Sequence, residues 1–167
     1  MSKPVIETRL AHRGDASDLA RIYNEGIRDR VATFETRPRT PDDILAWFDS
    51  RHPIVVVIKD QSVVAFASSS LYRSRDCYAG IAEFSIYVER SQRRNGFGKL
   101  AMQRLLVEAS GAGFWKLLSR VFPENNASRR LLAGLGFREV GVYEKHGRLD
   151  GVWRDVVIVE RLLDANL

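Results

Sequence analysis

Hydrophobic positions along the chain change their period several times, and these changes predict alternating strands and helices. Residues 5–10 alternate as in a strand, whereas the apolar residues of 19–27 recur with the spacing of one helical face. Asp15 and Asp18 precede that face and are expected to cap its helix. A second helix is predicted after Thr40, because this N-cap residue is followed by a proline and two acids. The chain therefore opens with one strand and two helices.

The middle and the end of the chain contain apolar, β-branched runs. Residues 54–59 and 63–72 flank the dipeptide Asp60-Gln61, which predicts a hairpin. Later elements are expected as strands at 81–88, 115–122, 138–143 and 152–162, helices that end near Ala112 and Gly134, and a polar loop at 144–151. This order predicts a single α/β domain over residues 1–167 with a mixed sheet. Three successive strands in its middle do not fit a simple doubly wound fold.

The composition restricts the class of protein. With 167 residues and 45% apolar content, the chain can form one domain core without crosslinks, and its single cysteine excludes an intrachain disulfide and a cysteine-rich metal cluster. No run approaches the roughly 20 apolar residues of a membrane span, and the N-terminus lacks the apolar core of a secretory signal, so we expect a cytoplasmic protein without a membrane partner. The net charge of +5 is dispersed among 21 acids, which argues against a nucleic-acid partner.

The segment Arg93-Arg94-Asn95-Gly96-Phe97-Gly98-Lys99 joins the strand at 81–88 to the next predicted helix. The first N–H groups of a helix lack internal partners, and the helix dipole adds roughly half a positive charge there, so the junction suits an anion. Its glycines let a phosphate approach the backbone. The spacing fits neither a Walker loop nor a dinucleotide fingerprint. For the Gly-x-Gly alone, a tight structural turn remains an alternative.

A second motif follows about thirty residues later. Residues 125–128 (Asn-Asn-Ala-Ser) start an aliphatic helix that stops before Gly136-Phe137. Together with R-x-x-G-x-G at Arg93, Gly96 and Gly98, this motif resembles the GCN5-related N-acetyltransferase (GNAT) superfamily. A closer resemblance to its phosphinothricin acetyltransferase subfamily lies in residues 22–24, 34–36, 73–78, 83–88 and 145–147. The resemblance covers nearly the whole chain and implies the GNAT fold, with a mixed, mostly antiparallel sheet of about seven strands and about four helices.

The resemblance also implies acetyl-CoA as the acetyl donor, and no metal. The backbone of Ile86, Tyr87 and Val88 would pair with the pantetheine arm, whose amides behave like an added strand. Residues 93–99 would then bind the pyrophosphate. The Asn125 side chain would hydrogen-bond the pantetheine, although it could equally cap the following helix, and the two roles can coexist.

Glu83 is the candidate catalytic base. An amine attacks a thioester only as the free base, whereas an α-ammonium is mostly protonated at neutral pH. Glu83 stands in an otherwise apolar stretch, so burial could raise its pKa toward the working range. The subfamily uses a glutamate at this position as base, and the alternative is an acid on a solvated strand face. Where many members have a tyrosine acid, this chain has Leu132, so the thiolate would leave unaided or take a proton from Tyr78 or water.

Substrate-binding residues are expected around two arginines. Arg73 and Arg75 are two apart at the expected end of a strand, so both should point to one face and suit a ligand with two anionic ends. Arginines exposed without a ligand are the alternative. In the subfamily the segment that corresponds to residues 73–78, which includes Tyr78, helps bind phosphinothricin. This substrate is an amino acid with a carboxylate and a phosphinate. Phe34 would close over the substrate or anchor its loop, and His146 lies near the acceptor site of the superfamily.

These features predict an acetyl-CoA-dependent amino-acid N-acetyltransferase. Its acceptor would be the α-amine of a small glutamate-like amino acid, of the phosphinothricin, arsinothricin, methionine sulfone or methionine sulfoximine type, with resistance to an antibiotic or herbicide as one outcome. Alternatives are acetylation of a peptide N-terminus, polyamine or aminoglycoside, and a CoA-binding module without turnover. A cationic acceptor should meet an acidic pocket, whereas Arg73 and Arg75 make this one basic. The resemblance also implies a homodimer, and residues 156–159 fit either its interface or a buried strand.

Overall fold

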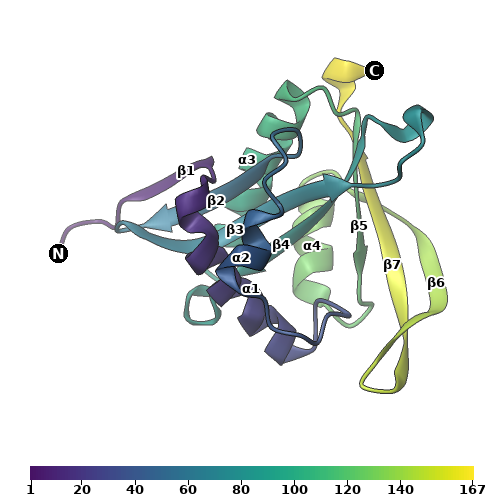
Figure 1. Cartoon of the computed structure of the whole chain (residues 1–167), viewed down its shortest axis with the longest axis horizontal. Coiled ribbons are helices and arrows are strands. Elements are labelled where there is room, and N and C mark those ends of the chain that lie inside the picture. Colours follow the sequence, from purple (N-terminus) through teal and green to yellow (C-terminus); the bar gives the residue numbers. More distant parts are fainter.

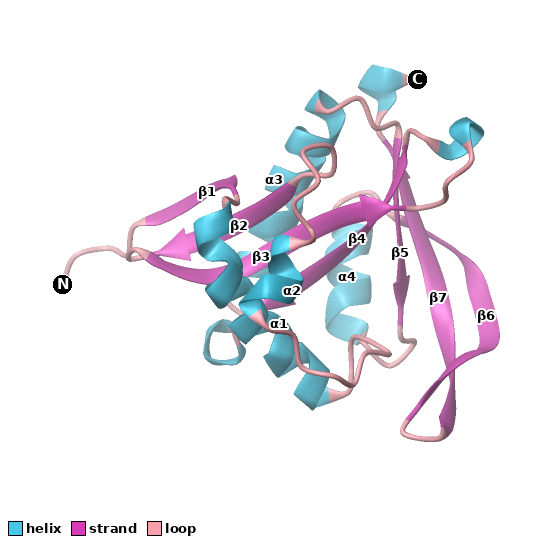
Figure 2. Cartoon of the chain, viewed as in Figure 1, coloured by secondary structure: helices cyan, strands magenta, loops and turns pink.

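One sheet forms the centre of the molecule. In the computed structural model, which describes residues 1–167, the sheet has seven strands in the order β1-β2-β3-β4-β5-β7-β6 (Figures 1 and 2). The strands are β1 (Ile6–Leu10), β2 (Ile54–Lys59), β3 (Ser62–Leu71), β4 (Ile81–Val88), β5 (Lys116–Val121), β6 (Arg138–Leu149) and β7 (Val152–Leu162). All neighbours are antiparallel except β4 and β5. The predicted mixed, mostly antiparallel sheet is confirmed.

Helices cover both faces of the sheet. They are α1 (Ala16–Asp29), α2 (Pro41–Leu45), α3 (Phe97–Gly111) and α4 (Asn126–Gly134), with short 3-10 turns between elements (Figure 2). Alternation along β4 separates two cores: Phe84 packs on the α3 and α4 side, whereas Tyr87 packs on the α1 and α2 side. None of the helices has the length and apolar character that crossing a bilayer requires.

A third, smaller core lies on β7 and the end of β5. It contains Val156 and Ile158, and Phe34 packs against it from the loop after α1. The apolar run 156–159 is thus the buried centre of β7, because each of its four residues is less than a tenth exposed. The structure selects the buried-strand interpretation of this run over the interface.

The pairing of β4 with β5 is short, and the candidate functional site lies where it ends. The parallel ladder joins only residues 81–83 to residues 116–118, after which the two strands separate. On its other side β4 stays paired with β3 from Ala82 to Val88. The second half of β4 therefore has one edge without a neighbouring strand.

Two predicted helix starts have different outcomes. The Thr40 start is confirmed, since the Thr40 hydroxyl accepts a hydrogen bond from the Asp43 amide at 3.2 Å and the Asp43 carboxylate accepts one from the Thr40 amide at 2.8 Å. Asp15, in contrast, does not cap α1. Its carboxylate turns back to accept the His12 amide at 2.9 Å and to pair with Arg9 at 2.8 Å, so a short 3-10 turn precedes the helix.

The predicted polar loop at 144–151 is wrong. β6 continues to Leu149, which pairs with Val152, after an irregularity between Tyr143 and Gly147. The hairpin turn is only Asp150-Gly151, with φ of +50° and +79°. This Asp-Gly pair is a typical two-residue hairpin signal, whereas the polar side chains before it are those of an exposed edge strand.

Candidate functional site

A cleft opens where β4 and β5 separate. Its walls come from β4, β5 and α4, and they include Ser85, Ile86, Ser119, Asn125 and Leu132. At its closed end the Ser119 hydroxyl donates a hydrogen bond of 2.8 Å to the Phe84 carbonyl, which bridges the two strands where the ladder stops. Beyond this bridge the edge of β4 is free to pair with an extended ligand.

The entrance to α3, which follows β4 in the chain, presents a row of free amides. The backbone N–H groups of residues 94–99 donate to no protein acceptor. Gly96 is the N-cap with a φ of +81°, a conformation that favours glycine, and Arg94 before it has a φ of +66°. Free amides and the helix dipole together make an anion site.

Arg93 has a structural role in this segment. Its guanidinium lies 2.7 Å from the Asp29 carboxylate at the end of α1 and donates to the Val88 carbonyl at 3.3 Å. Arg90 contacts the same carboxylate at 2.6 Å. Burial would raise the pKa of Asp29, but the hydrogen bonds from Arg90 and Arg93 outweigh it and lower that pKa. These contacts fix the loop to α1.

The other side chains of the segment divide into free and packed ones. Arg94 and Lys99 are exposed and form no ion pair. Asn95 donates to the Gln92 carbonyl at 3.0 Å. Phe97 is buried, and a Cβ at Gly98 would lie 3.0 Å from a Leu131 methyl, so Gly98 lets α3 pack close to α4. Arg94 and Lys99 are thus the cations that remain available to a ligand.

Asn125 confirms its predicted capping role. Its side-chain oxygen accepts the Ser128 amide at 3.2 Å, and its amide group donates to the Val31 carbonyl at 3.4 Å. Contact with a pantetheine arm stays a prediction, although Asn125 does line the cleft. Leu132 lies one turn after Ser128, is 2% exposed and lines the same cleft, so this position offers no proton.

Glu83 is not in the apolar setting expected from its neighbours. Its side chain is 26% exposed and faces Arg120 of β5, with Nη2 to Oε1 at 2.9 Å and Nη1 to Oε2 at 3.4 Å. Arg120 lines the β4–β5 cleft. The candidate base is therefore paired with a guanidinium from the neighbouring strand.

A second cleft, of about 290 Å³, lies on the face that Glu83 shares with Tyr87. Tyr23, Trp47, Ser70 and Tyr87 are among its walls. Tyr23 meets Tyr87 edge to face at 4.9 Å and Trp47 at 5.2 Å. Burial raises the pKa of Tyr87, so its hydroxyl stays protonated at neutral pH. Ser70 pairs directly with Glu83 across β3 and β4, which places the candidate base beside this cleft.

Arg73 and Arg75 do not share a strand face as predicted. β3 ends at Leu71, and both arginines belong to the exposed loop that follows. The Arg73 guanidinium lies 5.2 Å from the centre of the Tyr72 ring, and that of Arg75 lies 5.9 Å from the centre of the Tyr78 ring. The pKa of Arg73 is raised mainly by Tyr72 and, to a smaller extent, by the charge of Glu83.

Phe34 and His146 lie on neighbouring elements. The Phe34 ring meets Phe122 edge to face at 5.0 Å, and a Cβ at Gly147 would come within 2.8 Å of it. Phe34 is therefore the anchor of its loop, one of the two interpretations left open by the sequence. His146 is exposed beside Tyr143, at 4.9 Å between ring centres, and lines neither cleft.

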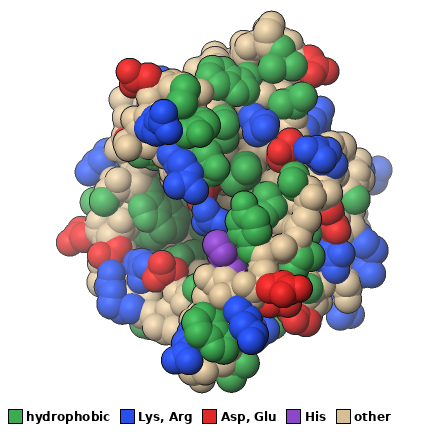
Figure 3. Space-filling model, turned by 90° about the vertical axis from the view of Figure 1, so that its right-hand side faces the viewer, with side chains coloured by type: hydrophobic (Ala, Val, Ile, Leu, Met, Phe, Trp, Pro, Cys, Tyr) green, Lys and Arg blue, Asp and Glu red, His purple; other side chains and the backbone are tan.

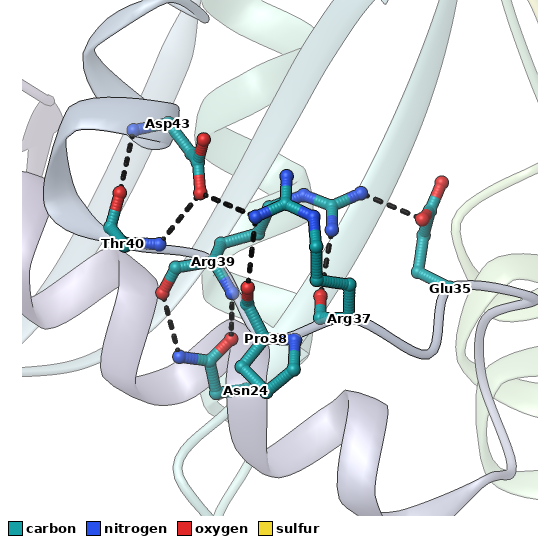
Figure 4. Close-up of polar contacts among 7 residues, drawn as sticks. All are labelled: Asn24, Glu35, Arg37, Pro38, Arg39, Thr40 and Asp43. Atoms are coloured by element: carbon teal, nitrogen blue, oxygen red, sulfur yellow. Dashed lines mark hydrogen bonds and ion pairs between the residues drawn. The ribbon is translucent and has the colours of Figure 1, made fainter.

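The loop that carries Phe34 is fixed at its base (Figure 4). Asn24 of α1 holds the Arg39 backbone with two hydrogen bonds of 2.9 Å and 2.7 Å, and Arg39 pairs with Glu35 at 2.7 Å. Arg37 lies 3.2 Å from Asp43 of α2. Polar contacts at one end and Phe34 at the other thus hold the loop over the sheet.

Figure 3 views the molecule from the side of β5, β6 and β7. Hydrophobic side chains line a hollow in this face, and lysine or arginine side chains lie along it. Apolar walls with dispersed positive charge suit a small organic anion.

Arg120 is the residue that sequence analysis missed. A weak signal was present, because Arg120 is a charged residue within the strand predicted at 115–122. Its pairing with Glu83 depends on the parallel register, in which Glu83 lies opposite Leu118, and no local pattern specifies that register.

Comparisons with known proteins agree with this geometry. A model of the acetyltransferase (GNAT) family matches residues 19–137. A phosphinothricin N-acetyltransferase of Streptomyces coelicolor is 31% identical, with 95% of this chain and 96% of that protein covered. An L-methionine sulfoximine/L-methionine sulfone acetyltransferase of Salmonella typhimurium is 29% identical, with 95% of each chain covered. A phosphinothricin acetyltransferase of Sinorhizobium meliloti, solved with acetyl-CoA, superposes with a TM-score of 0.87 at 27% identity over 95% of this chain and 88% of that one.

Proposed function

This chain belongs to the acetyltransferase (GNAT) family and is an acetyl-CoA-dependent acyltransferase, and we propose that its acceptor is the α-amine of a small, glutamate-like amino acid. The acceptors named for the relatives are of this kind, namely phosphinothricin and methionine sulfoximine or sulfone. The predicted GNAT fold is confirmed by the sheet and by the solved relatives.

One observation supports the proposal most strongly: the free edge of β4 runs from the unpaired amides of residues 94–99 to the carboxylate of Glu83. The amides, with Arg94 and Lys99, would bind the diphosphate of acetyl-CoA. Residues 86–88 would pair with the pantetheine arm, and Asn125 would contact it from the opposite wall. The thioester would then lie where the strands meet, next to Glu83.

In the proposed reaction Glu83 acts as the base. Acetyl-CoA supplies the activated acyl group. Glu83 takes a proton from the substrate ammonium, directly or through water, so that the amine nitrogen can form a bond to the acetyl carbon. The carbon–sulfur bond breaks and the CoA thiolate takes a proton from water or Tyr78, since Leu132 has none to donate. Positioning by the strand edge and proton removal by Glu83 are the protein's contributions.

The positive charge near the acceptor end supports an anionic substrate. Arg73 and Arg75 are exposed on the loop after β3 and form no ion pair, and Arg73 lies within the field of Glu83. They would bind the distal acid of a glutamate analogue. A polyamine or aminoglycoside would meet charges of its own sign here.

A thiol-release assay over free amino acids tests the proposal. We expect CoA release with phosphinothricin, methionine sulfone and methionine sulfoximine, and slower release with glutamate, whose planar γ-acid differs from their tetrahedral groups. Faster release with a peptide N-terminus or a polyamine would favour those acceptors instead. CoA binding without turnover on any amine would indicate a binding module.

We also infer a homodimer that uses the edge strand β6. Val140, Val142 and Tyr143 on β6 and Val152 and Trp153 on β7 are all about half exposed, and β6 has no neighbour on its outer side. Unpaired edges with apolar side chains favour association. Light scattering should give twice the 19.0 kDa chain mass, and Val142→Lys should reduce it to that of a monomer.

A further inference from the structure

Arg120 of β5 faces the candidate base on β4, and neither side chain has another hydrogen-bond partner. The two guanidinium nitrogens lie 2.9 Å and 3.4 Å from the two carboxylate oxygens. Both side chains remain partly exposed to solvent, 26% for Glu83 and 40% for Arg120. An ammonium that approaches Glu83 must therefore share the carboxylate with Arg120 or displace it.

We propose that Arg120 binds the α-carboxylate of the substrate, so that the Glu83–Arg120 pair selects free α-amino acids. This inference rests on the proposed function. The ammonium and the carboxylate of an α-amino acid are attached to the same carbon, and their charges are the reverse of those of the pair. The substrate can present its cation to Glu83 and its anion to Arg120 at once. One internal ion pair is exchanged for two intermolecular pairs, and no charged group is left without a partner.

This exchange has a consequence for catalysis. While Arg120 contacts both oxygens of Glu83, these oxygens are occupied and less accessible to a substrate ammonium. A substrate carboxylate that draws Arg120 away leaves Glu83 free to take the proton of the adjacent ammonium. Amines without a neighbouring carboxylate can reach Glu83 but cannot release it, so they should be poor acceptors.

Arg120 is well placed to bind the α-carboxylate, whereas Arg73 and Arg75 are better placed to bind the distal acid. Arg120 belongs to a strand next to the ladder at residues 116–118, which fixes its position relative to Glu83. Arg73 and Arg75 lie on an exposed loop, where they can meet the variable distal end of a substrate. The α-carboxylate and the side-chain acid would thus have separate arginines.

The test compares each acid with its neutral α-carboxamide, using phosphinothricin and methionine sulfone as the two parent amino acids. For the unaltered protein and for Arg120→Gln, kcat/KM is measured on both members of each pair. We expect Arg120→Gln to lower kcat/KM on the acids by about tenfold or more, mainly through KM. On the carboxamides kcat/KM should stay the same or rise, because Glu83 no longer has to be released from Arg120. Intrinsic differences between acid and amide reactivity cancel, because the same two substrates are used with each protein.

Two further variants separate binding from structural effects. Arg120→Lys keeps a positive charge and should retain part of the preference for the acids. Lys116→Gln removes a cation from the same strand, where Lys116 pairs with Glu160 at 3.4 Å, and it should leave the preference unchanged. Because Arg138 also contacts Glu160, this control leaves no isolated acid.

The outcomes distinguish this inference from the proposed function. If the unaltered protein turns over neither amino acid, the proposed acceptor class fails. If it turns them over but Arg120→Gln lowers acid and carboxamide equally, Arg120 only supports the fold or Glu83, and the inference is overturned. The inference would also be overturned if the preference for the acids over their carboxamides disappeared in Arg75→Gln but persisted in Arg120→Gln. Arg75 would then bind the α-carboxylate.

Discussion

The two ends of β4 are built differently for the two ligands that they would bind. At the carboxyl end, next to Val88, the proposed anion site consists of the unpaired backbone amides of residues 94–99, and Arg93 is fixed to Asp29. At the amino end, Glu83 is paired with a side chain from a separate strand, Arg120 of β5. The first end suits a ligand part that is always the same, and the second suits an acceptor that differs between relatives.

This difference also explains which parts of the site the sequence could indicate. A helix start is local, so the cation and glycine pattern of residues 93–99 predicted the free amides correctly. The acceptor end depends on which strands are neighbours and on their register, so Arg120 was missed, and Arg73 and Arg75 were placed on a strand that ends at Leu71. Long-range register is not encoded in a short pattern.

The elements of the fold divide in the same way. The period of apolar positions indicated the main helices and strands, because each buries one face. It failed at residues 144–151, where β6 is an exposed edge strand whose polar residues resemble a loop. It also failed at Asp15, because Arg9 of the preceding strand and the His12 amide compete with the helix for the carboxylate.

The largest expected loss of activity comes from a substitution at the acceptor end of β4. Glu83→Gln should lower kcat by about 10²- to 10⁴-fold, because the amide cannot take the proton of the ammonium. Binding of acetyl-CoA should not change, since Glu83 lies away from residues 94–99. Thiol release and calorimetry measure the two quantities. Full activity of the variant at neutral pH would show that another group is the base.

A smaller effect, on stability and not on activity, is expected at the Asp15–Arg9 pair, which lies apart from both ends of β4. Asp15 is 4% exposed and pairs with Arg9, so Asp15→Asn should lower the free energy of unfolding by about 2 kcal/mol at pH 7 without a change in either KM. Asp18→Asn, which alters an exposed pair with Arg21, is the control and should change stability by less than about 0.5 kcal/mol.

The stability effect of Asp15 should depend on pH. Burial would raise the pKa of Asp15, but the hydrogen bonds from Arg9 and His12 outweigh burial and lower it. The ionised carboxylate therefore stabilises the fold above its unfolded pKa of about 3.9, and this contribution is lost as the pH falls through the lower folded value. Urea unfolding should show the gap between parent and variant closing below about pH 4. A gap that persists at pH 2 would contradict this origin.

At the carboxyl end, Gly96→Ala should weaken acetyl-CoA binding by about tenfold, because a left-handed φ of +81° costs an alanine about 1–2 kcal/mol and shifts the amides. Turnover at saturating acetyl-CoA should stay near that of the parent. Gly111→Ala is the matched control, since Gly111 ends the same helix with open space around it. Equal weakening in both variants would mean that helix stability, rather than the N-cap, controls binding.

The smallest effect concerns the loop arginines. Arg75→Ala should raise KM about three- to tenfold for phosphinothricin, with little change in KM for acetyl-CoA, because an exposed arginine contributes modestly to anion binding. Arg13→Ala, an exposed arginine of the turn before α1, is the control. If both KM values rose together, the two ends of β4 would not be independent.

The central claim is that free amides after residue 93 bind the diphosphate of acetyl-CoA and so direct its thioester along β4 to Glu83. A crystal structure of the complex with CoA tests it most directly. We expect diphosphate oxygens within hydrogen-bond distance of the amides of residues 94–99, and pantetheine amides beside the backbone of residues 86–88. A diphosphate held elsewhere, with those amides still unpaired, would contradict the account.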